Sequence, residues 1–349
     1  MRHPEKTYLP AEWEEHEATW IGWPHNASDW PGKFAPIPWV YGEIVRKLVP
    51  GEIVRILVES KEHEASARRI LERCAADMDR VEFFRFPTNR GWTRDSGPAF
   101  VRDGARESAV IRRFRFNGWA RYDDWKKDDA IPPKVAKSLG LPLLPGTFRG
   151  RELVLEGGAI DVNGAGTLMT TAECLLDEKV QVRNPGMGRG DYEAAFAELL
   201  GVRKTLWLNR GIAGDDTHGH VDDIARFVNA RTVALCRETN SADENYRPLE
   251  ENRERLEGMT LEDGSKVELV FLPMPSPLFL DGRRLPASYA NFYVANAAVL
   301  VPTFNDPKDR LALAVLSAVF RDRPVVGIHA VDLAWGLGTL HCLTRQQPR

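Results

Sequence analysis

A recurring order of expected elements is the feature of this sequence that most constrains its fold. Residues 53–58 are typical of a strand, 61–78 of a helix with apolar residues at helical spacing, and 81–86 of a second strand. A loop and the short apolar run at 99–101 follow. The first unit is therefore strand, helix, strand, loop and strand.

The same order returns along the rest of the chain. Copies are expected over residues 167–228, 232–295 and 298–344, and a less regular copy lies between residues 108 and 162. Five units in 349 residues give a period of roughly 70, which suits a ring of small αβ modules. We therefore expect an α/β fold in which residues 1–349 form one domain of about five strand-helix-strand-strand units.

Polar residues stand at the same place in several of these units. Asp95, Glu156, His220 and Cys342 each lie at or beside the last strand of a unit, and they are separated by 61, 64 and then 122 residues. The last interval is close to two periods. If the units surround an axis, these side chains converge on its centre, which predicts a single active site assembled from most of the chain.

Cys342 is the candidate nucleophile. It lies on an expected strand at 339–344, between glycines and a polar tail, which is typical of a displayed thiol, although a free cysteine can equally be a buried and inert small residue. The clusters at 92–98 and 214–223 supply the carboxylates and the imidazole that chemistry at a thiolate needs. The four cysteines contain no Cys-x-x-Cys pair, which argues against a zinc knot and fits a reducing compartment.

The segment at 220–228 is expected to be a strand. Residues two apart then face the same side, so His220 and Asp222 would share one pocket. Asp222 and Asp95 could supply two carboxylates for a planar cation such as a guanidinium, and Glu156 could hydrogen-bond His220. A competing interpretation of Asp95 is an ion pair with its neighbour Arg94 or a cap on the turn that follows.

Metal chemistry is the main rival. The sequence His218-x-His220-x-Asp222 resembles the His-x-His pair on a strand of metal-dependent amidohydrolases. The pair lies in mid-chain, however, and only His329 and His341 follow it, neither in an obvious ligand context. The sequence has no Walker-type glycine loop and no G-x-G-x-x-G after a strand, so we expect no nucleotide cofactor and no metal.

Composition narrows the class of partner. The 47 basic and 50 acidic residues are interspersed and leave a formal charge of −3, so no footprint for nucleic acid or an anionic membrane is present. No signal-peptide core and no stretch of roughly 20 apolar residues is found. We expect a cytoplasmic protein with a small-molecule partner.

Tryptophans are concentrated near the N-terminus: Trp13, Trp20, Trp23, Trp30 and Trp39. They fit a loop that closes the ring or lines a pocket, and they equally fit packing in the core.

Seven motifs occur in order along nearly the whole chain. They are 10–20 (PAEWEEHEATW), 92–98 (WTRDSGP), 156–158 (EGG), 166–176 (GTLMTTAECLL), 216–222 (DTHGHVD), 287–293 (ASYANFY) and 338–347 (GTLHCLTRQQ). With these motifs the chain resembles the agmatine deiminase and peptidylarginine deiminase-like family of guanidino-group-modifying enzymes.

The resemblance implies a five-bladed αβ propeller and a two-step reaction. Cys342 would attack the guanidinium carbon, ammonia would leave, and water would hydrolyse the thiouronium intermediate to a ureido product. His220 would be the general acid and base, Asp95 and Asp222 would bind the guanidinium nitrogens, and Glu156 would support the histidine. The resemblance implies no metal and no cofactor.

Within the family the sequence is more similar to agmatine deiminases than to enzymes acting on protein arginine, because it lacks extra domains. We expect agmatine to be the substrate, with Trp92 stacking on the guanidinium and Asp216 in the binding site. Free or peptidyl arginine is the alternative. His218 stands where agmatine deiminases commonly carry a carboxylate, and beside the pocket it would favour a substrate with a carboxylate. A homodimer is compatible with the sequence.

Overall fold

Five sheets of three or four strands form the framework of residues 7–104 and 109–349, the part of the chain that the computed structural model describes. In order across each sheet, the strands are β20 (Thr344–Pro348), β1 (His16–Gly22), β2 (Ile53–Leu57) and β3 (Val81–Phe84); β4 (Ala99–Arg102), β5 (Ala109–Arg113) and β6 (Leu143–Pro145); β11 (Lys204–Leu208), β10 (Thr167–Thr171) and β9 (Asp161–Val162); β12 (Ala225–Phe227), β13 (Thr232–Arg237) and β14 (Glu268–Pro273); and β17 (Tyr293–Val294), β18 (Val299–Thr303) and β19 (Val325–His329).

Each sheet contains a parallel pair whose strands are joined by a helix. The connecting helices are α1 (Ile37–Leu48) and α2 (Lys61–Arg73) in the first sheet, then α5 (Ile131–Leu139), α7 (Arg189–Leu200), α8 (Tyr246–Glu257) and α9 (Asp309–Val319). A parallel pair requires such a crossover because a tight turn can join only antiparallel strands. Two small hairpins lie outside these sheets: β7 (Thr147–Phe148) with β8 (Arg151–Glu152), and β15 (Phe279–Leu280) with β16 (Arg283–Arg284).

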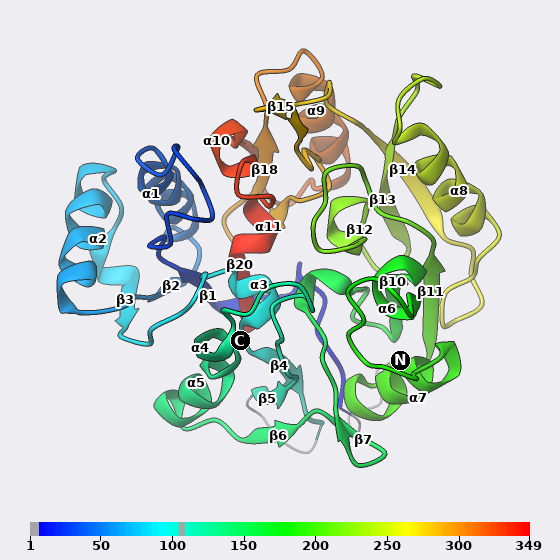
Figure 1. The fold of residues 1–349 in the computed structure, drawn as a ribbon, viewed down its shortest axis with the longest axis horizontal. Helices are drawn as coiled ribbons and strands as arrows, with labels where there is room; N and C mark the ends of the chain where they lie inside the picture. Colours follow the sequence, from blue (N-terminus) through cyan, green and yellow to red (C-terminus); the bar gives the residue numbers. More distant parts are fainter. Residues whose placement is uncertain (1–6, 105–108) are drawn as a thin grey trace.

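Each sheet also contains one antiparallel strand. In four sheets it is the strand immediately before the parallel pair in the sequence, whereas in the first sheet it is the C-terminal strand β20, which pairs with β1. The two ends of the described chain are therefore joined in one sheet. Figure 1 shows the sheets and their helices around a centre that is occupied by two short helices, α3 (Thr93–Ser96) and α11 (Leu340–Leu343).

The expected elements agree with the structure where the apolar pattern is long. The strand at 204–208 has the expected bounds, and the helix expected over 61–78 ends at Arg73 because Ala75 adopts a positive φ of 56°. The expected strand at 220–228 is wrong in its first half, which forms the 3-10 turn η3 (Val221–Asp223) before β12. The expected strand at 339–344 is likewise wrong, because these residues form α11 and β20 begins only at Thr344.

The N-terminal tryptophans follow the core-packing interpretation only in part. Trp20, Trp23 and Trp30 are buried in the core, whereas Trp39 on α1 is 41% exposed. No helix among the described residues has the length and apolar character needed to cross a membrane.

Candidate active site

Short helical turns carry all five residues that were expected to be catalytic. Asp95 lies in α3, Glu156 precedes a 3-10 turn, His220 precedes η3, Asp222 lies within η3, and Cys342 lies in α11. Each turn lies just before the antiparallel strand of a sheet, namely β4, β9, β12 and β20. The residues occupy equivalent places in their units, as expected, but on turns and not on strands.

Asn291 occupies the equivalent place in the unit between those of His220 and Cys342, for which no site residue was expected. It lies just before β17, 71 residues after His220 and 51 before Cys342. Its side chain is fully buried and donates a hydrogen bond to the Cys342 sulfur over 3.1 Å. The interval of 122 residues between His220 and Cys342 was the signal that a member was missing, and the motif at 287–293 contains it.

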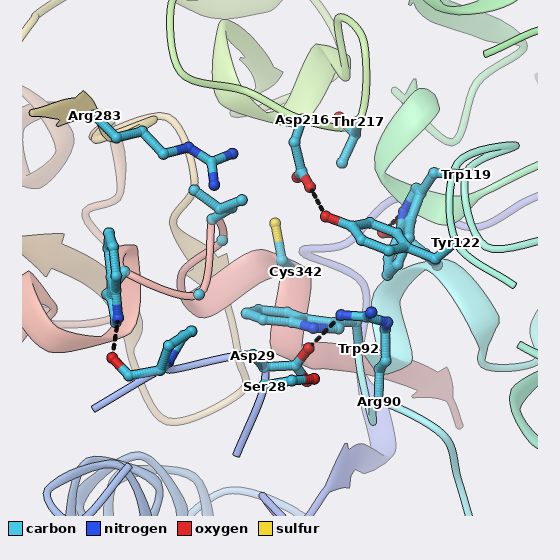
Figure 2. Close-up of a pocket in the computed structure, with 16 residues that line it drawn as sticks. Ser28, Asp29, Arg90, Trp92, Trp119, Tyr122, Asp216, Thr217, Arg283 and Cys342 are labelled. Atoms are coloured by element: carbon cyan, nitrogen blue, oxygen red, sulfur yellow. Dashed lines mark hydrogen bonds and ion pairs between the residues drawn. The ribbon is translucent and has the colours of Figure 1, made fainter. Parts of the chain in front are cut away.

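A cavity of about 340 Å³ leads to the nucleophile (Figure 2). Its inner part is lined by Trp92, Asp95, Trp119 and Cys342, and Trp30 packs behind Trp92 with ring centroids 5.4 Å apart. The tryptophan-rich N-terminal segment lines the cavity as expected, through Ser28, Asp29 and Pro31, but the indoles at the cavity are those of Trp92, Trp119 and Trp335.

His220 lies among three carboxylates. Its Nδ1 is 3.9 Å from Asp95 and 4.0 Å from Asp222, and its Nε2 is 3.9 Å from Glu156. Both ring nitrogens are buried and have no hydrogen-bond partner. Burial opposes the charged form, but the charge of Asp95 and the contacts with Cys174 and Glu156 prevail, so the pKa of His220 is well above its usual value of 6.5. The imidazole is therefore protonated at neutral pH.

The convergence of these groups requires a glycine at position 158. A Cβ there would lie 2.5 Å from Nδ1 of His220 and 3.0 Å from the Asp95 carboxylate, which is too close for both. The backbone N–H of Gly158 also donates to Asp95 over 2.9 Å, while the other Asp95 oxygen accepts from the Trp119 indole over 2.9 Å. Two neutral donors thus fix the orientation of Asp95, and the competing ion pair with Arg94 does not form, because Arg94 bonds Glu12.

Asp222 keeps one oxygen free. Its Oδ2 contacts Nδ1 of His341 at 2.6 Å, whereas its Oδ1 is buried without a hydrogen-bond partner. Burial would raise the pKa of Asp222, but the hydrogen bond from His341 and the nearby positive charges lower it below its usual value of 3.8. An ionised carboxylate with an unused oxygen can accept hydrogen bonds from a cation.

Burial and neighbouring carboxylates favour the neutral thiol of Cys342. Burial and the charges of Asp222, Asp223 and Asp95 raise its pKa well above 9, and the hydrogen bond from Asn291 acts in the opposite direction. The sulfur lies 3.8 Å from Asp222 Oδ2. A cation bound between these carboxylates would remove the main electrostatic obstacle to the thiolate.

Glu156 is held behind the histidine by a fully buried ion pair. Its Oε1 accepts from Nε of Arg183 over 3.1 Å, and both side chains are inaccessible. Burial opposes ionisation, but Arg183 and His220 lower the pKa of Glu156 to about 2. The Cys174 sulfur lies within 4.8 Å of Glu156 and His220, a proximity that the sequence did not reveal.

The mouth of the cavity carries charges of both signs. Asp216 accepts a hydrogen bond from Tyr122 over 2.5 Å, and Asp29 pairs with Arg90 at 2.6 Å. Figure 2 shows both contacts, with the guanidinium of Arg283 turned toward the cavity. Asp216 therefore lies in the expected cavity, as does Trp92.

His218 is turned to a different set of partners. Its Nε2 contacts Asp177 at 2.9 Å and its Nδ1 lies 4.0 Å from Glu173, and the residue does not line the cavity. Of the described residues, the groups close enough to share a metal ion are Glu156, Cys174 and His220, and Asp222, Asp223 and Cys342, so His218 and His220 do not form a pair of ligands. The structure does not support the His-x-His interpretation.

Comparisons with known proteins cover the whole chain. The family model for Porphyromonas-type peptidyl-arginine deiminase matches residues 8–348. Agmatine deiminase of Medicago truncatula is 34% identical over 100% of both chains, and agmatine deiminase of Ectopseudomonas mendocina is 31% identical over 98% of this chain and 95% of its own.

Solved structures agree with the sequence relatives. Agmatine deiminase of Enterococcus faecalis superposes with a TM-score of 0.88 at 28% identity, covering 98% of this chain and 96% of that one. A C. jejuni agmatine deiminase with substrate bound gives 0.85 at 29% identity, with coverage of 98% and 96%. These matches confirm the resemblance carried by the seven motifs, and the chain belongs to the Porphyromonas-type peptidyl-arginine deiminase family.

Proposed function

We propose that this chain is a deiminase that hydrolyses agmatine to N-carbamoylputrescine and ammonia through a covalent thiouronium on Cys342. The observation that carries the proposal is the unpartnered Oδ1 of Asp222, buried beside the thiol. A buried ionised oxygen without a donor is costly unless a ligand supplies one. Full-length relatives that are agmatine deiminases support the choice of substrate.

Binding comes first in the proposed mechanism. A guanidinium is planar and offers N–H donors at fixed angles, so Asp222 and Asp95 would each take an edge of it while the Trp92 ring stacks on its face. The cation would neutralise the carboxylates that raise the pKa of Cys342. The thiol proton would then leave to solvent, so the nucleophile would form only when substrate is bound.

Proton transfer would follow from the protonated state of His220. Thiolate attack on the guanidinium carbon gives a tetrahedral adduct, and protonation of one nitrogen by the imidazolium releases ammonia and leaves the thiouronium. Neutral His220 would then take a proton from water as that water attacks the same carbon. Collapse expels the Cys342 thiolate, the remaining hydroxyl proton leaves to solvent, and the ureido product is formed. Glu156 would keep the imidazole oriented during both transfers.

The mouth of the cavity distinguishes two substrates. Asp216, at the outer part of the cavity, would bind the far ammonium of agmatine. Arg283 favours a second candidate, free arginine, because it is exposed and forms no ion pair with the described residues, and its charge would attract an α-carboxylate. Conversion of arginine, free or peptidyl, would give citrulline.

Product assays test the proposal. Ammonia and ureido product should form from agmatine faster than from arginine or from a blocked arginine peptide, without added metal. A chelator should leave activity intact and alkylation of Cys342 should remove it. A larger kcat/KM for arginine would overturn the choice of agmatine, and chelator-sensitive activity that survives alkylation would overturn the thiol mechanism.

The finer architecture is also a proposal. We infer that the five sheets are the blades of a five-bladed αβ propeller and that residues 1–349 are one domain. Support comes from the repeated order of a parallel pair, its crossover helix and one antiparallel strand. A cytoplasmic location and a homodimer stay predictions from the sequence.

A further inference from the structure

The residue before the nucleophile forms a link between two buried carboxylates. Nδ1 of His341 contacts Asp222 at 2.6 Å and Nε2 contacts Glu12 at 2.8 Å, and the side chain is 2% exposed. Neither contact reaches the cavity, since His341 is not among its lining residues. The contact with Asp222 links the imidazole to the site.

Glu12 is surrounded by donors and cannot serve as one itself. Its Oε2 also accepts from Arg94 over 2.9 Å, and its Oε1 accepts from Arg226 over 2.8 Å and from the backbone N–H of Val294 over 2.9 Å. Burial opposes ionisation, but Arg226, His341 and Arg94 hold the pKa of Glu12 well below its usual value. Nε2 of His341 must therefore carry the proton of the contact with Glu12.

Nδ1, the other ring nitrogen of His341, also contacts an ionised carboxylate. Asp222 has a lowered pKa and accepts at Oδ2, so Nδ1 of His341 carries a proton as well. An imidazole that donates from both nitrogens is an imidazolium. Its charge also balances the cluster below the site, in which three carboxylates meet three cations: Glu12, Asp161 and Asp222 with Arg94, Arg226 and His341.

We propose that His341 is a positioning residue for substrate binding: clamped by Glu12 as an imidazolium, it keeps Asp222 ionised and leaves Oδ1 of that carboxylate free for the guanidinium. The inference rests on the proposed deiminase function. His341 does not touch the reacting atoms. The other charged or titratable groups near Asp222 come from α3, η3 and the residue before it, α11 and β12: Asp95, His220, Asp223, Cys342 and Arg226.

The effect depends on pH in a way that a purely structural role does not. Without the imidazolium, the pKa of Asp222 rises because burial is no longer offset, so its carboxylate takes up a proton as the pH falls. Binding of a guanidinium is then lost first at low pH. In the native protein Asp222 stays ionised over the same range, so its affinity does not decline in this way.

Agmatine binding to turnover-blocked variants tests the proposal. On a Cys342→Ala background, His341→Asn keeps a neutral donor toward Asp222, whereas His341→Ala removes it. Calorimetry at pH 8, 7 and 6 should show Kd raised roughly tenfold for His341→Asn at pH 7 and more for His341→Ala, since hydrogen bonds to charged groups contribute about that factor or more. The ratio to the background should grow as the pH falls.

His16 offers a matched control. It is also buried, contacts Glu52 at 3.1 Å, and contacts the backbone carbonyl of Glu12, not its carboxylate, at 2.7 Å; neither partner lines the cavity. His16→Asn should cost stability and leave agmatine affinity and its pH dependence unchanged. A Kd ratio for His341→Asn that is constant across pH, or equal to that of His16→Asn, would show that His341 is only structural.

Two outcomes separate this inference from the proposed function. If Cys342→Ala binds arginine but not agmatine, the substrate is wrong and the same comparison is made with arginine. If the variants fail to fold, or no guanidino compound binds, ¹⁵N-histidine spectra of the native protein decide whether His341 is an imidazolium. At pH 7 both ring nitrogens of His341 should carry a proton, and a spectrum in which only one of them is protonated would overturn the proposal.

Discussion

The side-chain amide of Asn291 donates a hydrogen bond to the sulfur of Cys342 over 3.1 Å, and its oxygen accepts from Thr339 Oγ1 over 2.8 Å and from the backbone N–H of His341 over 3.0 Å. One side chain thus fixes the turn that carries the nucleophile and is the donor that opposes the rise in the thiol pKa. Fixing the turn and donating to the sulfur are thus both functions of Asn291, which belongs to the unit between those of His220 and Cys342.

Asn291→Ala should therefore lower kcat/KM by roughly tenfold or more, the usual effect of losing a hydrogen bond to a charged group. The pH at which Cys342 is half alkylated should rise, because the thiolate loses its donor. Asn291→Asp should be worse than Asn291→Ala, since a carboxylate adds a negative charge beside the sulfur. Equal pH profiles of alkylation for the native protein and both variants would exclude this role.

Formation of the nucleophile on binding can be tested with two alkylating agents. A small reagent that carries an amidinium should modify Cys342 much faster than neutral iodoacetamide at pH 7, because its charge offsets Asp222 and Asp95. Asp222→Asn should reduce that preference by slowing the cationic reagent and accelerating the neutral one. Peptide mapping identifies the modified cysteine, and the same rate ratio in Asp222→Asn would show that the carboxylate does not control the thiol.

The long elements and the convergence of the site were predictable from the sequence, whereas the local conformation of the catalytic residues was not. Strand 204–208 ends in the buried apolar run Leu206-Trp207-Leu208, and its bounds agree with the prediction. His220 and Cys342 lie in short segments that mix apolar and polar residues, and such segments do not distinguish a strand from a buried turn. Tertiary contacts decide there: the backbone N–H of His341 and of Cys342 bond Asn291, 50 and 51 residues away.

The orientation of the His218 side chain was likewise not predictable from the sequence. A motif places it beside the pocket, but it adopts a positive φ of 66° and turns toward Asp177. The partner lies 41 residues away on another loop, so neither spacing nor periodicity identifies it. Likewise, nothing in the local sequence around Glu12 indicates that it accepts from Arg226, 214 residues later.

The buried pair of Arg183 and Glu156 should be essential for stability. Arg183→Met leaves a buried carboxylate without its cation and should cost about 3–5 kcal/mol in the free energy of unfolding. Because the pKa of Glu156 is lowered to about 2 from 4.5, its contribution is complete above about 4.5 and is lost as the pH falls toward 2. Urea unfolding at pH 7 and pH 3 measures this difference.

The double variant is the control for this prediction. Glu156→Gln with Arg183→Met removes both charges, so it should be more stable than Arg183→Met alone, although the support for His220 is lost and activity should not return. A double variant as unstable as the sum of the single ones would mean that the two side chains do not interact in the folded protein.

Charge at the mouth of the cavity should decide between agmatine and arginine. Arg283→Ala removes a cation that repels the far ammonium of agmatine and attracts the carboxylate of arginine, so kcat/KM should rise for agmatine and fall for arginine. Asp216→Asn should act in the opposite direction. Both effects should shrink as the salt concentration rises, because exposed charges are screened.

Arg284 is the matched control, since it bonds Asp243 and Glu244 at 2.9 Å. Arg284→Ala should leave the agmatine to arginine ratio unchanged, and an equal shift in both variants would mean that general charge, and not the position of Arg283, sets the preference.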